Sequence, residues 1–192
     1  MMRTSNDPKP QRRVRVAAFT DKQTKTPRTA QENVQWSVRI IDRMAAEEPD
    51  VIVLTESFNG RGVPKQLVDR CETLDGPTIT TMRAKAKEHH CYLIPSIVEK
   101  RGDQLFNTSI VIDRQGEVVG QYDKTHPTDG EITECITPGP VQPKVITTDF
   151  GKIGCQICFD ANWYLDWKAL ADAGAEIIFF SSAYAAGRTL KA

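Results

Sequence analysis

The sequence predicts an α/β fold, and three observations carry this prediction. Short apolar runs alternate along the chain with segments of helical periodicity. Residues 51–54 are apolar throughout, which is typical of a strand buried on both faces of a sheet. Residues 91–98 and 105–112 are two further strand-like runs, and the turn Arg101-Gly102-Asp103 between them predicts an antiparallel hairpin.

The first half of the chain is expected to begin without regular structure. Residues 1–13 are polar and aperiodic, so we expect a disordered or frayed segment, with a first strand over residues 14–19. Apolar residues at three- and four-residue spacing predict a helix from Thr29 that ends before Pro49. A second helix is expected over residues 78–89.

The second half continues the alternation. A strand is expected over residues 117–122, followed by a long loop over 125–143. Residues 145–148 and 152–157 predict a strand pair, 163–173 a helix that ends at Gly174, and 176–180 a strand. Residues 183–192 resemble no closing element, so we expect one domain over residues 14–192 that is incomplete at its carboxyl end.

Composition excludes several classes of protein. Lys and Arg number 25 and Asp and Glu number 25, so no excess positive charge indicates a nucleic acid or membrane partner. No apolar run reaches the roughly 20 residues that span a bilayer, and we expect a cytoplasmic location. The three histidines lack the spacing of metal ligands, so no metal site is expected.

Three reactive residues each follow a predicted strand. Glu56 follows residues 51–55, Lys124 follows 117–122, and Cys158 follows 152–157. Singly, they could be a turn cap, a solvated cation and a small buried side chain. Ligands of open α/β sheets bind at the carboxyl ends of strands, where these residues would supply a base, a fixed cation and a nucleophile. Together they predict acyl-transfer chemistry.

Three segments resemble the nitrilase superfamily of carbon-nitrogen hydrolases, in the order that the family has them. The segments are residues 49–56 (PDVIVLTE), 122–126 (YDKTH) and 151–160 (GKIGCQICFD), with 134–139 (ECITPG) between the last two. The resemblance covers residues 14–183, and an ordered set is more specific than a single motif. It implies a nitrilase-like α-β-β-α sandwich whose C-terminal part is missing here.

The resemblance also implies roles for individual residues. Glu56 would be the general base, Lys124 the oxyanion stabiliser, Cys158 the nucleophile, and Glu134 a supporting second glutamate. The backbone N–H of Phe159 would complete the oxyanion site, and a positive Lys124 would favour the Cys158 thiolate. Residues beside the motifs are expected to bind substrate: Tyr122, His126, Asn162 and Trp163. No cofactor is required, and a complete domain is expected to form a homodimer.

The residues after Cys158 bear on the substrate. True nitrilases commonly carry Trp-Glu there, whereas this chain has Phe159-Asp160, which is similar to the amidase and N-carbamoylase branches. We therefore expect a small amide or N-carbamoyl compound. The alternative is that the incomplete chain is a catalytically inactive fragment that serves as an interaction module or is a remnant.

A rival interpretation comes from the five cysteines. Cys155 and Cys158 form a C-x-x-C pattern, which occurs in thiol-disulfide exchange proteins. However, Cys155 lies inside a predicted strand, where residues three apart point to opposite faces and cannot readily bond. Redox chemistry is therefore disfavoured.

Overall fold

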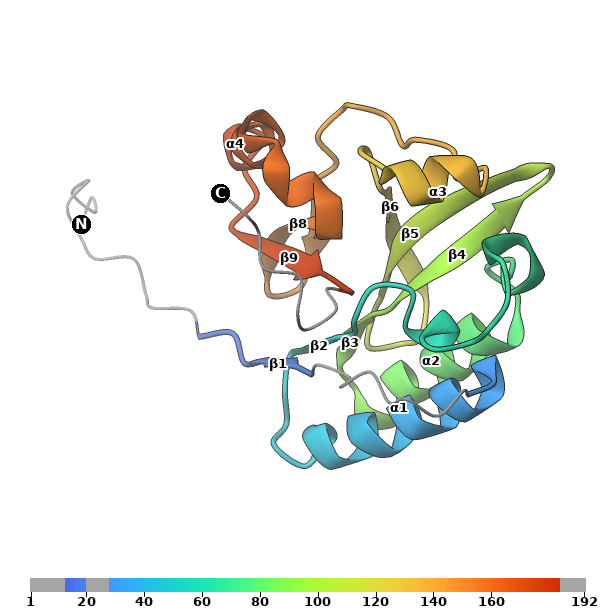
Figure 1. Cartoon of the computed structure of the whole chain (residues 1–192). Helices are drawn as coiled ribbons and strands as arrows, with labels where there is room; N and C mark the ends of the chain where they lie inside the picture. Colours follow the sequence, from blue (N-terminus) through green and yellow to red (C-terminus); the bar gives the residue numbers. More distant parts are fainter. Residues whose placement is uncertain (1–12, 20–27, 184–192) are drawn as a thin grey trace, which may run out of the picture.

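Two β-sheets lie between two layers of helix in the computed structural model, which describes residues 13–19 and 28–183 (Figure 1). The first sheet contains β1 (Val16–Ala18), β2 (Val51–Val53), β3 (Tyr92–Ile94), β4 (Ser96–Arg101), β5 (Gln104–Ile112) and β6 (Val118–Asp123). The second contains β7 (Ile146–Thr148), β8 (Gly151–Ile157) and β9 (Ile177–Ser181). This α-β-β-α arrangement confirms the predicted fold class.

The first sheet has the order β1-β2-β3-β5-β4, with β6 on β5 as well. Strands β1, β2 and β3 are parallel, so the wholly apolar β2 is central and fully buried, as predicted. The prediction of one strand over residues 91–98 is wrong in detail, because the chain breaks at Pro95 into β3 and β4. The break follows from proline, which lacks an N–H for the ladder. The hairpin itself joins β4 to β5.

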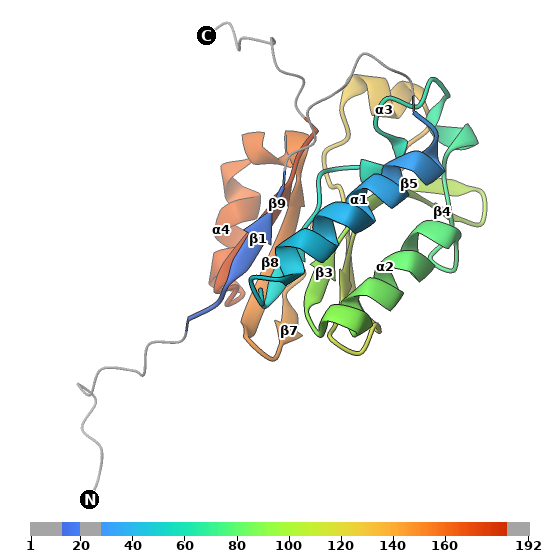
Figure 2. The same ribbon diagram turned by 90° about the horizontal axis from the view of Figure 1, so that it is seen from below.

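Helices α1 (Ala30–Ala45) and α2 (Pro77–His89) cover the outer face of the first sheet (Figure 2). Thr29 caps α1 reciprocally with Glu32, which fixes the start of that helix. Side chains alternate along the strands, so that Ile52 and Leu93 pack toward the helices and Val51 and Ile94 face the second sheet. Each face of the first sheet thus has its own apolar core.

The second sheet is a mixed one, since β7 and β8 are antiparallel whereas β8 and β9 are parallel. Helix α4 (Tyr164–Asp172) covers its outer face, and Gly154 of β8 allows this close approach, since a Cβ there would lie 3.0 Å from a methyl of Leu170. The predicted strand pair and the helix at 163–173 are confirmed to within a few residues.

Arg114 forms ion pairs with residues next to both sheets. Its guanidinium lies 2.8 Å from Asp50, which precedes β2, and 2.8 Å from Asp149, in the turn between β7 and β8. The described residues also contain three short 3-10 helices: η1 (Phe58–Gly60), η2 (Leu67–Asp69) and η3 (Cys158–Asn162). Within the described ranges, no helix is both long and apolar enough to cross a membrane.

The loop predicted over residues 125–143 is wrong at one point, because it contains the short helix α3 (Asp129–Thr133). The Thr128 side chain accepts from the Glu131 N–H, and the Glu131 side chain accepts from the Thr128 N–H, as in the capping box of longer helices. A five-residue helix is too short to show apolar periodicity, so only the cap could have indicated it. Most of residues 1–13 and of 183–192 lie outside the described residues.

Candidate active site

The three residues predicted for acyl transfer meet at one cavity of about 380 Å³. Glu56 follows β2 and Lys124 follows β6, both in the first sheet, whereas Cys158 is the residue after β8 of the second sheet. The cavity therefore lies where the ends of the two sheets come together. The predicted proximity of these three side chains is confirmed.

Lys124 is the most deeply buried charged group of the cavity. Its Nζ lies 2.8 Å from Glu56 Oε1 and 2.8 Å from Glu131 Oε2, and its side chain is only 1% exposed. Burial alone would lower the pKa of Lys124, but the two carboxylates outweigh it and raise that pKa above its ordinary value. Lys124 is thus a fixed positive charge at neutral pH.

Glu56 is held by three donors. Oε1 accepts from Lys124 Nζ at 2.8 Å and from Asn107 Nδ2 at 2.9 Å, and Oε2 accepts from the backbone N–H of Ala183 at 3.0 Å. Asn107 Nδ2 also donates to Glu131 Oε1 at 2.7 Å. One buried amide therefore bridges both carboxylates, and the orientation of Glu56 is fixed without substrate.

Cys158 is the first residue of η3 and directly follows the end of β8, where the chain bends sharply. Its backbone φ is +45°, which lies in the left-handed region that residues other than glycine rarely adopt. Burial, followed by the charge of Glu56, raises the pKa of the Cys158 thiol. The pKa of the thiol thus lies above its ordinary value, although a positive Lys124 was expected to favour the thiolate.

The backbone N–H of Phe159 stays a prediction as an oxyanion donor, and Phe159 is not among the residues that line the cavity. It is the second residue of η3, so its backbone N–H belongs to the first turn, where no intrahelical acceptor exists. The site thus combines a protonated thiol, a carboxylate able to take its proton, and two candidate donors for a developing oxyanion, Lys124 Nζ and Phe159 N–H.

The structure separates Glu134 from the place assigned to it. The second carboxylate beside Lys124 belongs to Glu131, whereas Glu134 Oε2 accepts from the backbone N–H of Leu67 at 2.6 Å. Both glutamates line the cavity. Glu131 was missed, although the pattern Thr128-x-x-Glu131 is a capping-box signal that could have drawn attention to it.

The four residues expected to bind substrate do not line this cavity. Tyr122 is buried, and its hydroxyl donates to Asp160 Oδ2 at 2.8 Å. The same oxygen accepts from Ile157 N–H, so Tyr122 helps to hold the backbone beside Cys158. His126 stacks on Trp163 with ring centroids 3.8 Å apart. Asn162 donates to the carbonyl of Phe159 at 2.9 Å. These residues support the walls around η3.

The C-x-x-C pattern is not a redox pair in this geometry. Cys155 lies inside β8, within the core between the sheets, and burial raises the pKa of its thiol to about 12. Both Cys155 and Cys158 are free. A thiol that stays protonated at physiological pH is a poor participant in exchange.

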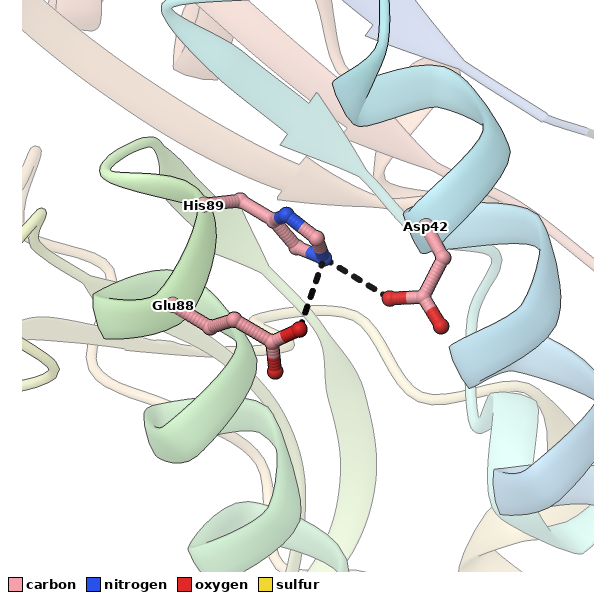
Figure 3. A group of neighbouring side chains, drawn as sticks. All are labelled: Asp42, Glu88 and His89. Carbon is pink, nitrogen blue, oxygen red and sulfur yellow. Dashed lines mark hydrogen bonds and ion pairs between the residues drawn. The ribbon is translucent and has the colours of Figure 1, made fainter.

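A second group of polar side chains lies on the outer helices, away from the cavity. Asp42 of α1 and His89 of α2 are 2.7 Å apart, with Glu88 beside them (Figure 3). Lys85 lies 2.8 Å from Asp42 and 2.9 Å from Glu88 and already supplies a cation there. This group is a set of ion pairs that joins α1 to α2.

Comparison with known proteins gives a consistent result. The family model for carbon-nitrogen hydrolases matches residues 15–192. An N-carbamoylputrescine amidase of Solanum lycopersicum is 30% identical over 160 residues, which cover 79% of this chain and 53% of that protein. A beta-ureidopropionase of Arabidopsis thaliana is 32% identical over 118 residues, which cover 58% of this chain and 29% of that protein. The chain therefore spans about half or less of these relatives.

Solved structures agree on the fold. A carbon-nitrogen hydrolase from Helicobacter pylori matches with a TM-score of 0.78 at 23% identity, over 89% of this chain and 60% of that one. An amidase from Nesterenkonia sp. matches with a TM-score of 0.79 at 22% identity, over 92% and 67%. One structure of that amidase has the acetamide moiety of fluoroacetamide covalently added at its active site cysteine. The chain belongs to the carbon-nitrogen hydrolase family.

Proposed function

We propose that this chain carries the catalytic centre of a hydrolase that cleaves a non-peptide carbon–nitrogen bond in a small amide or N-carbamoyl compound. The observation that carries the proposal is the buried Lys124, held between Glu56 and Glu131 in the cavity that Cys158 lines. The covalent adduct at the cysteine of the Nesterenkonia amidase supports Cys158 as the nucleophile.

In the first half of the proposed reaction, the Cys158 thiol passes its proton to Glu56 as Sγ attacks the substrate carbonyl. Burial and the charge of Glu56 raise the pKa of the thiol, so the resting Cys158 holds its proton at neutral pH and needs a base. Lys124 Nζ and Phe159 N–H would hold the oxyanion. Glu56 then protonates the leaving nitrogen, the carbon–nitrogen bond breaks, and ammonia or an amine departs from a thioester.

In the second half, water replaces the leaving group. Glu56 takes a proton from the water as its oxygen attacks the thioester carbonyl, and the carbon–sulfur bond breaks. The proton then returns to Cys158. Glu131 is the second carboxylate of this step, because it keeps Lys124 charged and lines the same cavity. The two halves together consume one water molecule for each carbon–nitrogen bond cleaved, and they return Cys158 and Glu56 to their starting protonation states.

The test is intact-mass analysis of the chain incubated with simple amides and N-carbamoyl amino acids. We expect an acyl adduct that Cys158→Ala abolishes and that accumulates in Glu131→Gln if this carboxylate assists the water step. The matched control is Cys135→Ala, which removes an exposed free thiol and should keep the adduct. Labelling that follows exposure alone, with Cys135 before Cys158, would instead indicate a catalytically inactive chain.

A further inference from the structure

Asp160 is a fully buried acid two residues after Cys158. It is 0% exposed, and it is not among the residues that line the cavity. Burial raises the pKa of its carboxyl, so a charge at this place is costly. Acids are seldom buried unless their oxygens are satisfied, and the hydrogen-bond partners of Asp160 therefore indicate what it does.

Both carboxyl oxygens of Asp160 accept from segments that carry the catalytic groups. Oδ1 accepts from the backbone N–H of His126 at 2.8 Å, and His126 is two residues after Lys124. Oδ2 accepts from the backbone N–H of Ile157 at 2.9 Å, and Ile157 directly precedes Cys158. One side chain thus links the backbone beside the proposed nucleophile to the backbone beside the cation.

Tyr122 extends this link between the two sheets. It belongs to β6 of the first sheet, and its hydroxyl donates to Asp160 Oδ2 at 2.8 Å, whereas Ile157 ends β8 of the second sheet. The apolar core between the sheets is not directional, so it does not by itself fix how one sheet lies along the other. Hydrogen bonds are directional, and those of Asp160 therefore constrain where Cys158 lies relative to Lys124.

The backbone at Cys158 depends on its neighbours for support, because a φ of +45° is unfavourable for a residue with a side chain. The Asp160 side chain holds Ile157, the residue before the bend. The backbone carbonyl of Asp160 accepts from Trp163 N–H at 3.1 Å, after the end of η3. Bonds to a single residue thus hold the bend on both sides.

We propose that Asp160 is a positioning residue, which holds the bend that bears Cys158 in register with the segment that bears Lys124. This inference rests on the proposed hydrolase function. In the attack, Sγ and Lys124 Nζ must reach the same carbonyl group, one at its carbon and the other at its oxygen. A misplacement of about 1 Å costs on the order of 100-fold in rate. Asp160 does not line the cavity, so its loss should lower kcat and leave KM nearly unchanged.

The variant Asp160→Asn keeps the shape of the side chain and changes one acceptor into a donor. An asparagine amide has one acceptor oxygen and one NH2 group. In either orientation, the NH2 group faces a backbone N–H, that of His126 or that of Ile157. One of the two segments is therefore released from the other.

Two further variants separate the contacts of Asp160. Tyr122→Phe removes one hydrogen bond and keeps both backbone bonds of the carboxylate. Asp166→Asn is the matched control, because the Asp166 carboxylate lies 2.6 Å from the ring Nε2 of His126 and bonds to neither backbone segment. The same change of charge is thus made beside the same loop.

The test measures two reactions of Cys158 in each variant. The first is acylation by butyramide and by N-carbamoylglycine, followed as intact mass together with kcat and KM. The second is alkylation by iodoacetamide, with the exposed Cys135 as an internal reference. Alkylation requires only an accessible thiolate, whereas acylation also requires alignment with Glu56 and Lys124.

We expect Asp160→Asn to lower kcat and the acylation rate by on the order of 100-fold, with KM and the alkylation rate within about threefold of the wild type. Tyr122→Phe should lower kcat by about tenfold, since it removes one hydrogen bond to a charged group. The double variant should lose no more than Asp160→Asn alone, because both changes act through one carboxylate. Asp166→Asn should stay within about threefold of the wild type.

Three results would overturn the inference, and they are distinguishable. If Asp160→Asn keeps the acylation rate of the wild type, the hydrolase function stands and the role of Asp160 is refuted. If Asp160→Asn unfolds, Cys158 is alkylated as fast as Cys135, and Tyr122→Phe then decides: a tenfold loss of kcat at constant KM supports the role, and an unchanged kcat refutes it. If the wild type forms no adduct with any amide, the proposed function is refuted and the role of Asp160 with it.

Discussion

Replacing Lys124 by methionine tests the charge balance of the cavity. Each N–O contact of 2.8 Å corresponds to about 6 kcal/mol of attraction at an effective dielectric constant of about 20. The cost of burying the charges offsets most of this attraction. Removing one partner of a buried ionic group nevertheless costs about 3–5 kcal/mol, because the remaining charges are left unpaired. We expect Lys124→Met to lower the free energy of unfolding by that amount.

The assay is urea denaturation at pH 7, with two comparison variants. Lys85→Met breaks an ion pair of the same 2.8 Å length to Asp42, but its groups are 17% and 42% exposed, so we expect a loss of about 1 kcal/mol or less. The double variant Lys124→Met with Glu131→Gln removes one stranded carboxylate and should recover part of the loss. A cost of Lys124→Met no larger than that of Lys85→Met would refute the reasoning.

The same variant should reverse the acid dependence of stability. In the wild type, burial raises the pKa of Glu131, but the interaction with Lys124 lowers it by more. The pKa of Glu131 therefore lies below its ordinary value. The stability this provides is present above the unfolded pKa of about 4.3 and is lost as the pH falls through the folded value. Without Lys124, burial would raise the pKa of the folded Glu131 carboxyl above its unfolded value, so Lys124→Met should gain stability as the pH falls from 7 to 5.

Three further predictions follow from the site and the join between the sheets. Alkylation of Cys158 by iodoacetamide should have a pH midpoint above the ordinary thiol value of about 8.5. Glu56→Gln should lower this midpoint, because it removes a neighbouring negative charge. A midpoint below that of Cys135 would contradict this prediction. Asn107→Asp should destabilise more than Asn107→Leu in urea, because it adds a third carboxylate; equal losses would argue against the bridging geometry. Arg114→Gln should cost about 1 kcal/mol, and an unchanged urea midpoint would show that its ion pairs contribute nothing.

The sequence predicted those features that depend on local composition. A wholly apolar run at residues 51–54 gives a central strand in almost any context, and the segments that end in Glu56, Lys124 and Cys158 place these residues after strands. Because ligands gather at the ends of strands, the proximity of the three could be predicted as well. Neither inference needed knowledge of the packing of side chains.

The parts that failed depend on geometry within loops. Glu131 and Glu134 are three residues apart, close to one turn of helix, so both reach the cavity although only Glu131 reaches Lys124. Position next to a motif was also a poor guide to which residues line the cavity. Tyr122 points into the core, and His126 stacks on Trp163 outside the cavity. The sequence does not encode such directions in its spacing alone.

Helix α3 is too short to be stable by itself, yet one of its side chains completes the charge balance around Lys124. Glu131 Oε2 accepts from Thr128 N–H at 2.8 Å and from Lys124 at 2.8 Å, so the cap of the helix and the compensation of the lysine are a single interaction. Local opening of residues 128–134 would therefore release the lysine from one of its counterions. Hydrogen exchange at the α3 amides should therefore speed up when Lys124 is replaced or Glu131 is protonated, which can be measured without any turnover.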